Sequence, residues 1–321
     1  MPDPWGRPNG HVHEKYERLI QAAQAQGTIK VAIAHPCDDV SLQGAGEAAR
    51  LRLIEPVLVG PPDRIRGVAD AGGFDISRME LVASEHSHDS AARAVELVTA
   101  GRVEALMKGS LHTDELMGAV VSRQAGIRTA RRISHCFIMD VPNHPDALII
   151  TDSAVNIAPT LDDKVDIVQN AIDLAHAMGV AEVRVAILSA LETVTAKVPS
   201  TIEAAALCKM AERGQITGAL LDGPLALDNA ISPTAAAIKQ IASPVAGRAN
   251  VLVVPDLEAG NMLAKSLSFL AQADAAGIVL GTRVPVILTS RADALLTRLA
   301  SCAVAVMVAA ARRRTPSASV R

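Results

Sequence analysis

The hydrophobic positions of the chain fall into short continuous runs that alternate with longer, helix-length segments. Nine runs rich in aliphatic residues predict strands, at 29–34, 54–60, 103–109, 135–141, 147–152, 183–190, 218–224, 249–256 and 284–290. Because these runs are continuously apolar rather than alternating, we expect strands that are covered on both faces. Their alternation with helix-length segments predicts an α/β fold with a largely parallel sheet.

Two of the helical segments carry clear end signals. The segment 162–179 opens after Thr160 and ends on Gly179, so we expect Thr160 to cap it. The segment 201–214 ends on Gly214, and we expect Ser200 or Thr201 as its N-cap. The polar ends of the chain, 1–13 and 313–321, are expected to be flexible.

Composition and charge narrow the classes of function. Aromatic residues make up 2% of the 321 residues and the net charge is −3, which argues against nucleic-acid binding because stacking platforms and a basic footprint are both lacking. The four cysteines are far apart and form no C-x-x-C pair, so we expect free thiols in a reducing compartment. No secretory signal is evident, and the longest apolar run, "CAVAVMVAAA", is too short for a membrane span. We therefore expect a cytoplasmic protein with no membrane partner.

Polar segments follow several predicted strands, where ligands bind in open α/β sheets. In "MKGSLHTDE", Lys108 supplies a charge, Gly109 permits close backbone approach, and Ser110, His112 and Thr113 are hydrogen-bond donors. At a helix N-terminus this combination suits an anion such as phosphate. The alternative is a simple helix cap with Lys108 on the surface.

The other candidates for substrate binding lie at further strand boundaries. They are Arg132, Ser134, Asp222, Asp228, Asn229, Asp256, Glu258 and Asn261. A surface basic pair is an alternative interpretation of Arg131 and Arg132. The acidic residues could bind Mg²⁺, bind a neutral part of a ligand, or cap helices, with Asp256 as an N-cap. Their spacing does not single out a metal, and we expect no metal site.

The stretch "PVILTSRADALLT", at 285–297, is the strongest candidate for chemistry. Ser290 could cap the following helix, with Asp293 completing a capping box. That interpretation leaves Arg291 unexplained, because its positive charge at a helix N-terminus opposes the helix dipole. A phosphate-like group would resolve the conflict, with Ser290 donating to it and Arg291 binding it in bidentate fashion.

With these segments assembled, the sequence resembles the phosphate acetyl/butyryltransferase family, the phosphotransacylases, from about residue 17 to about residue 312. Segments that carry the resemblance include "MKGSLHTDEL", "RRISHCFIMDVP", "DGPLALDNAIS", "VLVVPDLEAGNMLAK" and "GTRVPVILTSRAD". The resemblance implies two α/β domains of the isocitrate/isopropylmalate dehydrogenase type with the active-site cleft between them, the second domain being inserted in the first. With the turn cluster "DVPNHPD" as a guide, we predict a first domain at 14–145 plus 286–312 and a second at 146–285.

The resemblance also implies a reaction: acyl-CoA plus orthophosphate gives acyl phosphate plus CoA. It implies a homodimer, no permanently bound cofactor and CoA as a substrate. A carboxylate removes the thiol proton of CoA, and a Ser-Arg pair, matched by Ser290 and Arg291, holds the phosphate. In acetyl-specific members the acid lies seven residues beyond the serine, where this chain has Thr297. Asp293, Asp256 and Glu258 are therefore the candidate bases.

Three alternatives to an acetyl-specific enzyme remain open. The chain is similar to butyryl-type members as much as to acetyl-type members, and the Thr297 substitution is compatible with a non-catalytic relative that binds CoA or acyl phosphate. A dehydrogenase of related fold would need a dinucleotide site, but "QGAGEA" at 43–48 lacks the third glycine of that motif and follows no clear strand.

Overall fold

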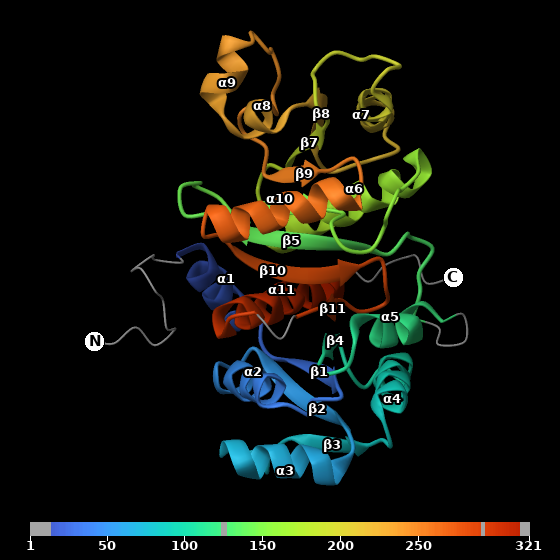
Figure 1. Ribbon diagram of the computed structural model, residues 1–321, viewed down its shortest axis with the longest axis vertical. Coiled ribbons are helices and arrows are strands. Elements are labelled where there is room, and N and C mark those ends of the chain that lie inside the picture. The colour runs from blue at the N-terminus through green and yellow to red at the C-terminus, as the bar shows by residue number, and fades with distance from the viewer. Residues whose placement is uncertain (1–13, 123–126, 290–292, 315–321) are drawn as a thin grey trace. The chain divides into compact units, whose positions relative to one another are not determined.

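The computed structural model describes residues 14–122, 127–289 and 293–314 and divides them into two compact units. Unit 1 comprises the described residues up to Arg131 and from Ala276 onward, and unit 2 comprises Arg132–Ala275. Each unit is built on strands that are mostly parallel and that alternate with helices (Figure 1). The predicted α/β fold class is confirmed.

In the described part of unit 1, the strands follow the spatial order β3-β2-β1-β4-β11-β10. Neighbouring strands are parallel, except that β10 runs antiparallel to β11. The strands are β1 (Ile29–Ala34), β2 (Ile54–Gly60), β3 (Glu80–Ala83), β4 (Ala105–Lys108), β10 (Asp274–Leu280) and β11 (Val286–Ile287). The helices are α1 (Glu14–Gln24), α2 (Asp39–Arg50), α3 (Pro62–Gly72), α4 (Ser87–Thr99), α5 (Thr113–Val121) and α11 (Leu295–Arg314).

The inner strands of unit 1 are buried because helices cover them on two sides. Figure 1 shows α2 on one side of β1 and β2, with α4 and α5 on the other. All four residues of β4 are buried, as are nearly all residues of β1 and β2. This two-sided cover explains why these segments of the sequence are continuously apolar.

Helix α11 is the most deeply buried helix of unit 1, with every residue from Leu296 to Ala310 buried. By length and composition alone it could cross a membrane, but 83% of its most apolar stretch is buried inside the structure. That degree of burial is typical of a core helix, and it confirms the interpretation of "CAVAVMVAAA" as a buried helix.

In unit 2 the strands follow the order β5-β6-β9-β7-β8, and only the pairing of β5 with β6 is antiparallel. The strands are β5 (Ser134–Asp140), β6 (Leu148–Thr151), β7 (Arg184–Leu188), β8 (Leu220–Leu225) and β9 (Val251–Val253). The helices are α6 (Leu161–Ala177), α7 (Pro199–Glu212), α8 (Leu227–Ile231), α9 (Pro233–Ile238) and α10 (Leu257–Leu270). One face of the core includes Met139, Ile150, Leu252 and Ala264, from β5, β6, β9 and α10.

The unit boundaries of the structure differ from those that we predicted at 145/146 and 285/286. They lie at 131/132 and 275/276. Strand β5 belongs to unit 2 because it pairs with β6, and the turn cluster at 140–146 joins these two strands. Strands β10 and β11 pair with each other, and β11 pairs with β4 of unit 1.

The predicted helix caps have different outcomes. Thr160 caps α6 as predicted, since its side chain accepts a hydrogen bond from the backbone N–H of Asp163. The prediction of Ser200 or Thr201 as the cap of α7 is wrong, because the helix begins earlier, at Pro199, with Val198 in the cap position. The hydroxyl of Thr201 instead donates to the carbonyl oxygen of Val198 at 2.7 Å.

The contact between α1 and β10 generates a prediction for stability. The buried hydroxyl of Tyr16 accepts a hydrogen bond from the backbone N–H of Ala276 at 2.6 Å. We expect Tyr16→Phe to lower the free energy of unfolding by about 1–2 kcal/mol, because a buried N–H loses this acceptor. Urea unfolding followed by circular dichroism measures this change.

Arg18→Ala is the matched control, because Arg18 is an exposed residue of the same helix. Its effect should stay within about 0.5 kcal/mol. Equal effects of the two substitutions would contradict a stabilising role for the Tyr16 hydroxyl.

Candidate active site at the strand ends of unit 1

The order of strands in unit 1 reverses between β1 and β4. From β1 the chain passes through α2 to β2 and then through α3 to β3, both on one side of β1. It then returns through α4 to β4 on the other side of β1. In open α/β sheets such a switch point leaves a crevice at the carboxyl ends of the two strands, and ligands bind there.

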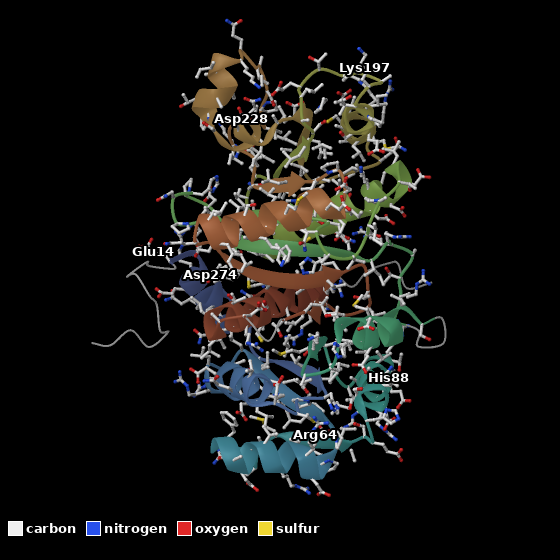
Figure 2. All side chains as sticks on the ribbon, viewed as in Figure 1. Glu14, Arg64, His88, Lys197, Asp228 and Asp274 are labelled. Atoms are coloured by element: carbon white, nitrogen blue, oxygen red, sulfur yellow. The ribbon has the colours of Figure 1, made fainter. Side chains whose placement is uncertain are left out.

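A cavity of about 500 Å³ lies at this switch point. Its walls come from the segments after β1 and β4, from α3, and from the beginnings of α4 and α5. The lining residues are His35, Cys37, Asp38, Arg64, Ser87, Ser110, Leu111, His112 and Glu115. Figure 2 labels Arg64 on α3. Two predicted site residues, Ser110 and His112, are therefore brought together in one cavity.

Backbone hydrogen bonds hold the ends of β4 and β1 together beside this cavity. The N–H of Gly109 donates to the carbonyl oxygen of Ala34 and the N–H of Ser110 donates to that of His35, each at 2.9 Å. The hydroxyl of Ser110 also donates to the carbonyl oxygen of His35, at 2.7 Å. A Cβ atom on Gly109 would lie 2.4 Å from the carbonyl oxygen of Ala34. Gly109 thus permits close approach, as predicted, but its close neighbour is the backbone of β1.

Lys108 is buried at the end of β4 instead of lying on the surface. Its Nζ atom donates to the carbonyl oxygens of Gly109 and Thr289, each at 3.4 Å. Thr289 is the last described residue before the predicted catalytic pair. Ser290 and Arg291 themselves lie outside the described residues.

The first turn of α5 carries both a predicted donor and an acid that sequence analysis missed. Thr113 is the first residue of α5 and is exposed. Glu115 accepts hydrogen bonds from the hydroxyl of Ser87 at 2.6 Å and from the N–H of His112 at 2.7 Å. These two bonds hold the pKa of the Glu115 carboxyl below its usual value, so the cavity contains a fixed negative charge.

Burial shifts the pKa of two further lining residues toward the uncharged form. Burial lowers the pKa of His35, whose Nδ1 atom lies 2.9 Å from the hydroxyl oxygen of Ser90. Burial likewise raises the pKa of the Cys37 thiol to about 11. At neutral pH we therefore expect an uncharged imidazole and an uncharged thiol, with Arg64 as the cationic side chain of the wall.

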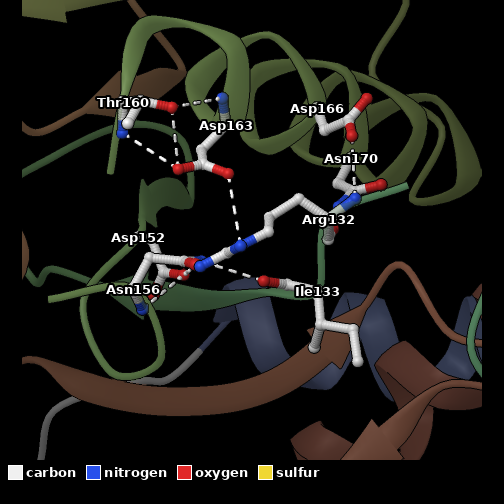
Figure 3. A network of polar contacts seen from close by, with 8 residues as sticks. All are labelled: Arg132, Ile133, Asp152, Asn156, Thr160, Asp163, Asp166 and Asn170. Atoms are coloured by element: carbon white, nitrogen blue, oxygen red, sulfur yellow. Dashed lines mark hydrogen bonds and ion pairs between the residues drawn. The ribbon is translucent and has the colours of Figure 1, made fainter. Parts of the chain in front are cut away.

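The predicted residues of unit 2 lie in other surroundings. Arg132 joins a polar network with helix α6 (Figure 3): its Nε atom donates to Asn156 at 2.7 Å, and its guanidinium lies 3.3 Å from the carboxylate of Asp163. Half of the Arg132 side chain stays exposed, which leaves surface for a ligand. Ser134 is fully buried, and its hydroxyl oxygen accepts from Asn170 at 2.9 Å.

The acidic and amide candidates of unit 2 lie in two regions of the chain, 256–261 and 222–229. Asp256 caps α10 by accepting from the N–H of Ala259 at 2.8 Å, and Glu258 in the first turn is exposed. This confirms the N-cap interpretation of Asp256. Asn261 donates to the carbonyl oxygen of Ser153 at 3.4 Å.

In the second region, Asp222 lies within β8, and Asp228 and Asn229 lie in α8. One carboxylate oxygen of Asp222 accepts from the N–H of Gly223 at 2.8 Å, whereas Asp228, labelled in Figure 2, is exposed. Asn229 is fully buried and donates to Glu192. Among the described residues, no group of three or more His, Cys, Asp or Glu side chains is placed to hold a metal ion.

Sequence analysis missed most of the residues that line the cavity. The strand-end rule could have found those after β1, because "HPCDD" follows the predicted strand at 29–34 directly. Arg64 and Ser87 carry no comparable signal, since each lies within or at the start of a helix and reaches the cavity only through the fold.

Comparisons with known proteins agree with this architecture. The family model described as "Phosphate acetyl/butaryl transferase" matches residues 81–306. A phosphate acetyltransferase of Rhizobium meliloti is 64% identical over 306 residues, which cover 95% of this chain and 97% of the relative. A phosphate butyryltransferase of Clostridium acetobutylicum is 37% identical over 296 residues, covering 92% and 98%. Among solved structures, a branched-chain phosphotransacylase from Enterococcus faecalis is similar with a TM-score of 0.78 and 30% identity, covering 88% and 99%.

The close approach of β4 to β1 predicts that Gly109 tolerates no side chain. We expect Gly109→Ala to lower the free energy of unfolding by about 1–3 kcal/mol, because the added Cβ must push the two backbones apart. Chemical unfolding measures this loss.

Gly118→Ala provides the matched control in α5, because a Cβ atom there meets nothing within 4 Å. This second substitution should stabilise the protein by about 0.5–1 kcal/mol, since alanine favours a helix interior. If Gly109→Ala proved as harmless as its control, the packing of the strand ends would be looser than described.

Proposed function

The chain belongs to the phosphate acetyl/butaryl transferase family, and on this premise we propose that it is a phosphate acetyltransferase. Acetyl-CoA and orthophosphate are converted reversibly to acetyl phosphate and CoA. The observation that carries this proposal is the 64% identity to a phosphate acetyltransferase over 95% of the chain. The butyryltransferase relatives support the alternative substrate at lower identity, 37% in the case of the Clostridium acetobutylicum protein.

The segment that follows β11 carries the chemistry in this proposal. In the direction of acetyl-CoA synthesis, the CoA thiolate attacks the carbonyl carbon of acetyl phosphate. A C–S bond forms, the C–O bond to phosphate breaks, and orthophosphate leaves. Ser290 donates a hydrogen bond to the phosphate and Arg291 binds it through two N–H groups, which stabilises the negative charge that develops.

We assign the removal of the thiol proton to Asp293. This carboxylate is half-buried, and it lies three residues beyond Ser290 in the sequence. Asp256 is less suited to this role because it caps α10, and Glu258 is less suited because it is exposed. A thiol with a pKa near about 8.5 requires only modest assistance from a positioned base.

The cavity at the β1/β4 switch point is the proposed binding site for part of the substrates. The imidazole of His112 offers a donor to a phosphate oxygen at the beginning of α5, and Ser110, whose hydroxyl donates to His35, lines the same cavity. We assign supporting roles in substrate binding to Lys108, Gly109 and Thr113. The enzyme works in this proposal without a permanently bound cofactor, in the cytoplasm, and with no nucleic-acid or membrane partner.

We further propose that the chain forms a homodimer through unit 2. Helix α10 exposes Met262, Phe269 and Leu270 at 62%, 83% and 85% of their surface. Met262 and Phe269 are seven residues apart and share one face of the helix, so they form an apolar stripe that a second copy can cover.

The activity is tested by phosphate-dependent release of CoA thiol from acetyl-, propionyl- and butyryl-CoA. We expect thiol release only with phosphate and the highest kcat/KM with acetyl-CoA. Ser290→Ala and Arg291→Ala should each lower kcat by about 100-fold to 1,000-fold, because each removes a donor to the developing charge.

Arg50→Ala serves as the control for arginine removal, since the Arg50 guanidinium pairs with Glu47 on the surface of α2 and should leave kcat unchanged. A preference for butyryl-CoA would replace the proposed substrate. Release of thiol without phosphate, or none at all, would contradict the proposed reaction.

The dimer is tested by sedimentation of Phe269→Glu. We expect the wild type to sediment as a dimer and the variant to shift toward the monomer, because a charge would be buried in the interface without a partner. Gln215→Glu makes the same change in charge at an exposed position of unit 2 and should stay dimeric. A wild-type monomer, or a dimeric Phe269→Glu variant, would remove α10 from the interface.

A further inference from the structure

The buried part of helix α11 contains one charged residue. Residues 296–310 are all buried, and within this run Arg298 is the single side chain with a formal charge. Its exposed fraction is 4%. A buried arginine in an otherwise apolar core helix is costly unless hydrogen bonds and opposite charges compensate it.

The partners of Arg298 lie beside the predicted catalytic segment. Its Nε atom donates to the backbone carbonyl oxygen of Asp293 at 3.3 Å. Burial lowers the pKa of the Arg298 guanidinium, and the carboxylates of Asp293 and Asp38 act in the opposite direction. Asp38 also lines the cavity and caps α2, where it accepts from the N–H of Ser41 at 2.8 Å.

Helix α2 leaves room for this arginine because its facing residue is glycine. A Cβ atom on Gly44 would lie 3.4 Å from the Cδ atom of Arg298. The aliphatic part of the arginine therefore packs against the backbone of α2, and its guanidinium extends toward the beginning of that helix and toward Asp293.

A second buried cation holds the other side of the same segment. Lys108 donates to the carbonyl oxygen of Thr289, and Arg298 donates to that of Asp293. These two carbonyl groups flank residues 290–292, which include the predicted phosphate-binding pair. Two buried positive charges thus contact the backbone on either side of the proposed catalytic residues.

Stability alone does not explain the charge at position 298. Replacing buried ionic groups by apolar residues of similar volume is often neutral or stabilising. Residues that break the local pattern of a core are commonly found where function requires them. The contacts of Arg298 indicate that the function for which it is retained involves the segment 289–293.

We propose that Arg298 is a positioning residue that fixes the backbone at Asp293 and thereby orients the carboxylate assigned to remove the thiol proton of CoA. Arg298 does not contact the substrate in this proposal and acts through Asp293. The inference rests on the proposed function, because the residue that Arg298 positions, Asp293, is the one assigned to proton removal.

Arg298→Met and Arg298→Lys test the proposal. Methionine keeps an unbranched stem that can pack against Gly44 but removes the charge and the donor to Asp293, while the neighbouring carboxylates remain half-exposed and can be hydrated. For Arg298→Met we expect kcat/KM with acetyl-CoA to fall by about 10-fold to 100-fold, as displaced catalytic groups typically cause. The loss should include kcat at saturating substrate, and Arg298→Lys should recover part of it.

Hydrogen exchange gives a readout that does not depend on turnover. We expect faster amide exchange in peptides covering 289–294 of Arg298→Met, with the rest of unit 1 unchanged. Ser301→Ala is the matched control, because Ser301 is buried one turn further along α11 and accepts from the N–H of Gly277 at 3.1 Å. It should lower Tm but leave kcat and the exchange at 289–294 unchanged.

Three outcomes are distinguishable. If Arg298→Met had the kcat and the exchange at 289–294 of the wild type and only a lower Tm, Arg298 would serve packing alone. This result would overturn the proposal. Equal kinetic loss in Ser301→Ala would do the same. A wild type that transfers no acyl group would refute the proposed function, while faster exchange in the variant would still establish the contact with Asp293.

Discussion

The backbone hydrogen bonds that join the ends of β4 and β1 are the constraint on which the rest of unit 1 depends. They require glycine at position 109, because the carbonyl oxygen of Ala34 occupies the space that a Cβ atom would need. By holding the two strand ends in contact, they place the loops after both strands around a single cavity. They also direct the buried Lys108 toward Thr289, so the segment that carries the proposed chemistry begins against the same strand end.

This arrangement assigns different physical tasks to the charged groups of unit 1. The carboxylates of Glu115 and Asp38 accept hydrogen bonds from backbone N–H groups at helix N-termini, where negative charge is stabilised. Lys108 and Arg298 contact backbone carbonyl groups on either side of residues 290–292. The two carboxylates that line the cavity are therefore held by their own partners, and the binding of phosphate is assigned to Ser290, Arg291 and His112. A preorganised site of this kind needs little rearrangement when charge develops on the substrate.

The sequence predicted nine of the eleven described strands, including the half-exposed edge strand β8, and missed β3 and β10. β1 and β2 have the predicted bounds, because their burial demands an uninterrupted apolar run. β3 lies at the edge of its sheet and has no buried residue, so its sequence lacks that signal. β10 was missed because "DAAGIVL" begins with small and polar residues that are only half-buried. The cavity lies at strand ends, where the strand-end rule places ligands. Its walls, however, include side chains from helices, such as Arg64, whose position depends on tertiary packing and has no signature in one sequence.

The central claim is that phosphate chemistry takes place at the strand ends of unit 1. A crystal structure of the protein grown with orthophosphate and CoA tests it most directly. The account predicts a phosphate within hydrogen-bond distance of Ser290 and Arg291, and ligand atoms against Ser110 and His112 in the cavity at the β1/β4 switch point. Ligands bound elsewhere, with that cavity empty and Ser290 and Arg291 without contact to phosphate, would contradict the account.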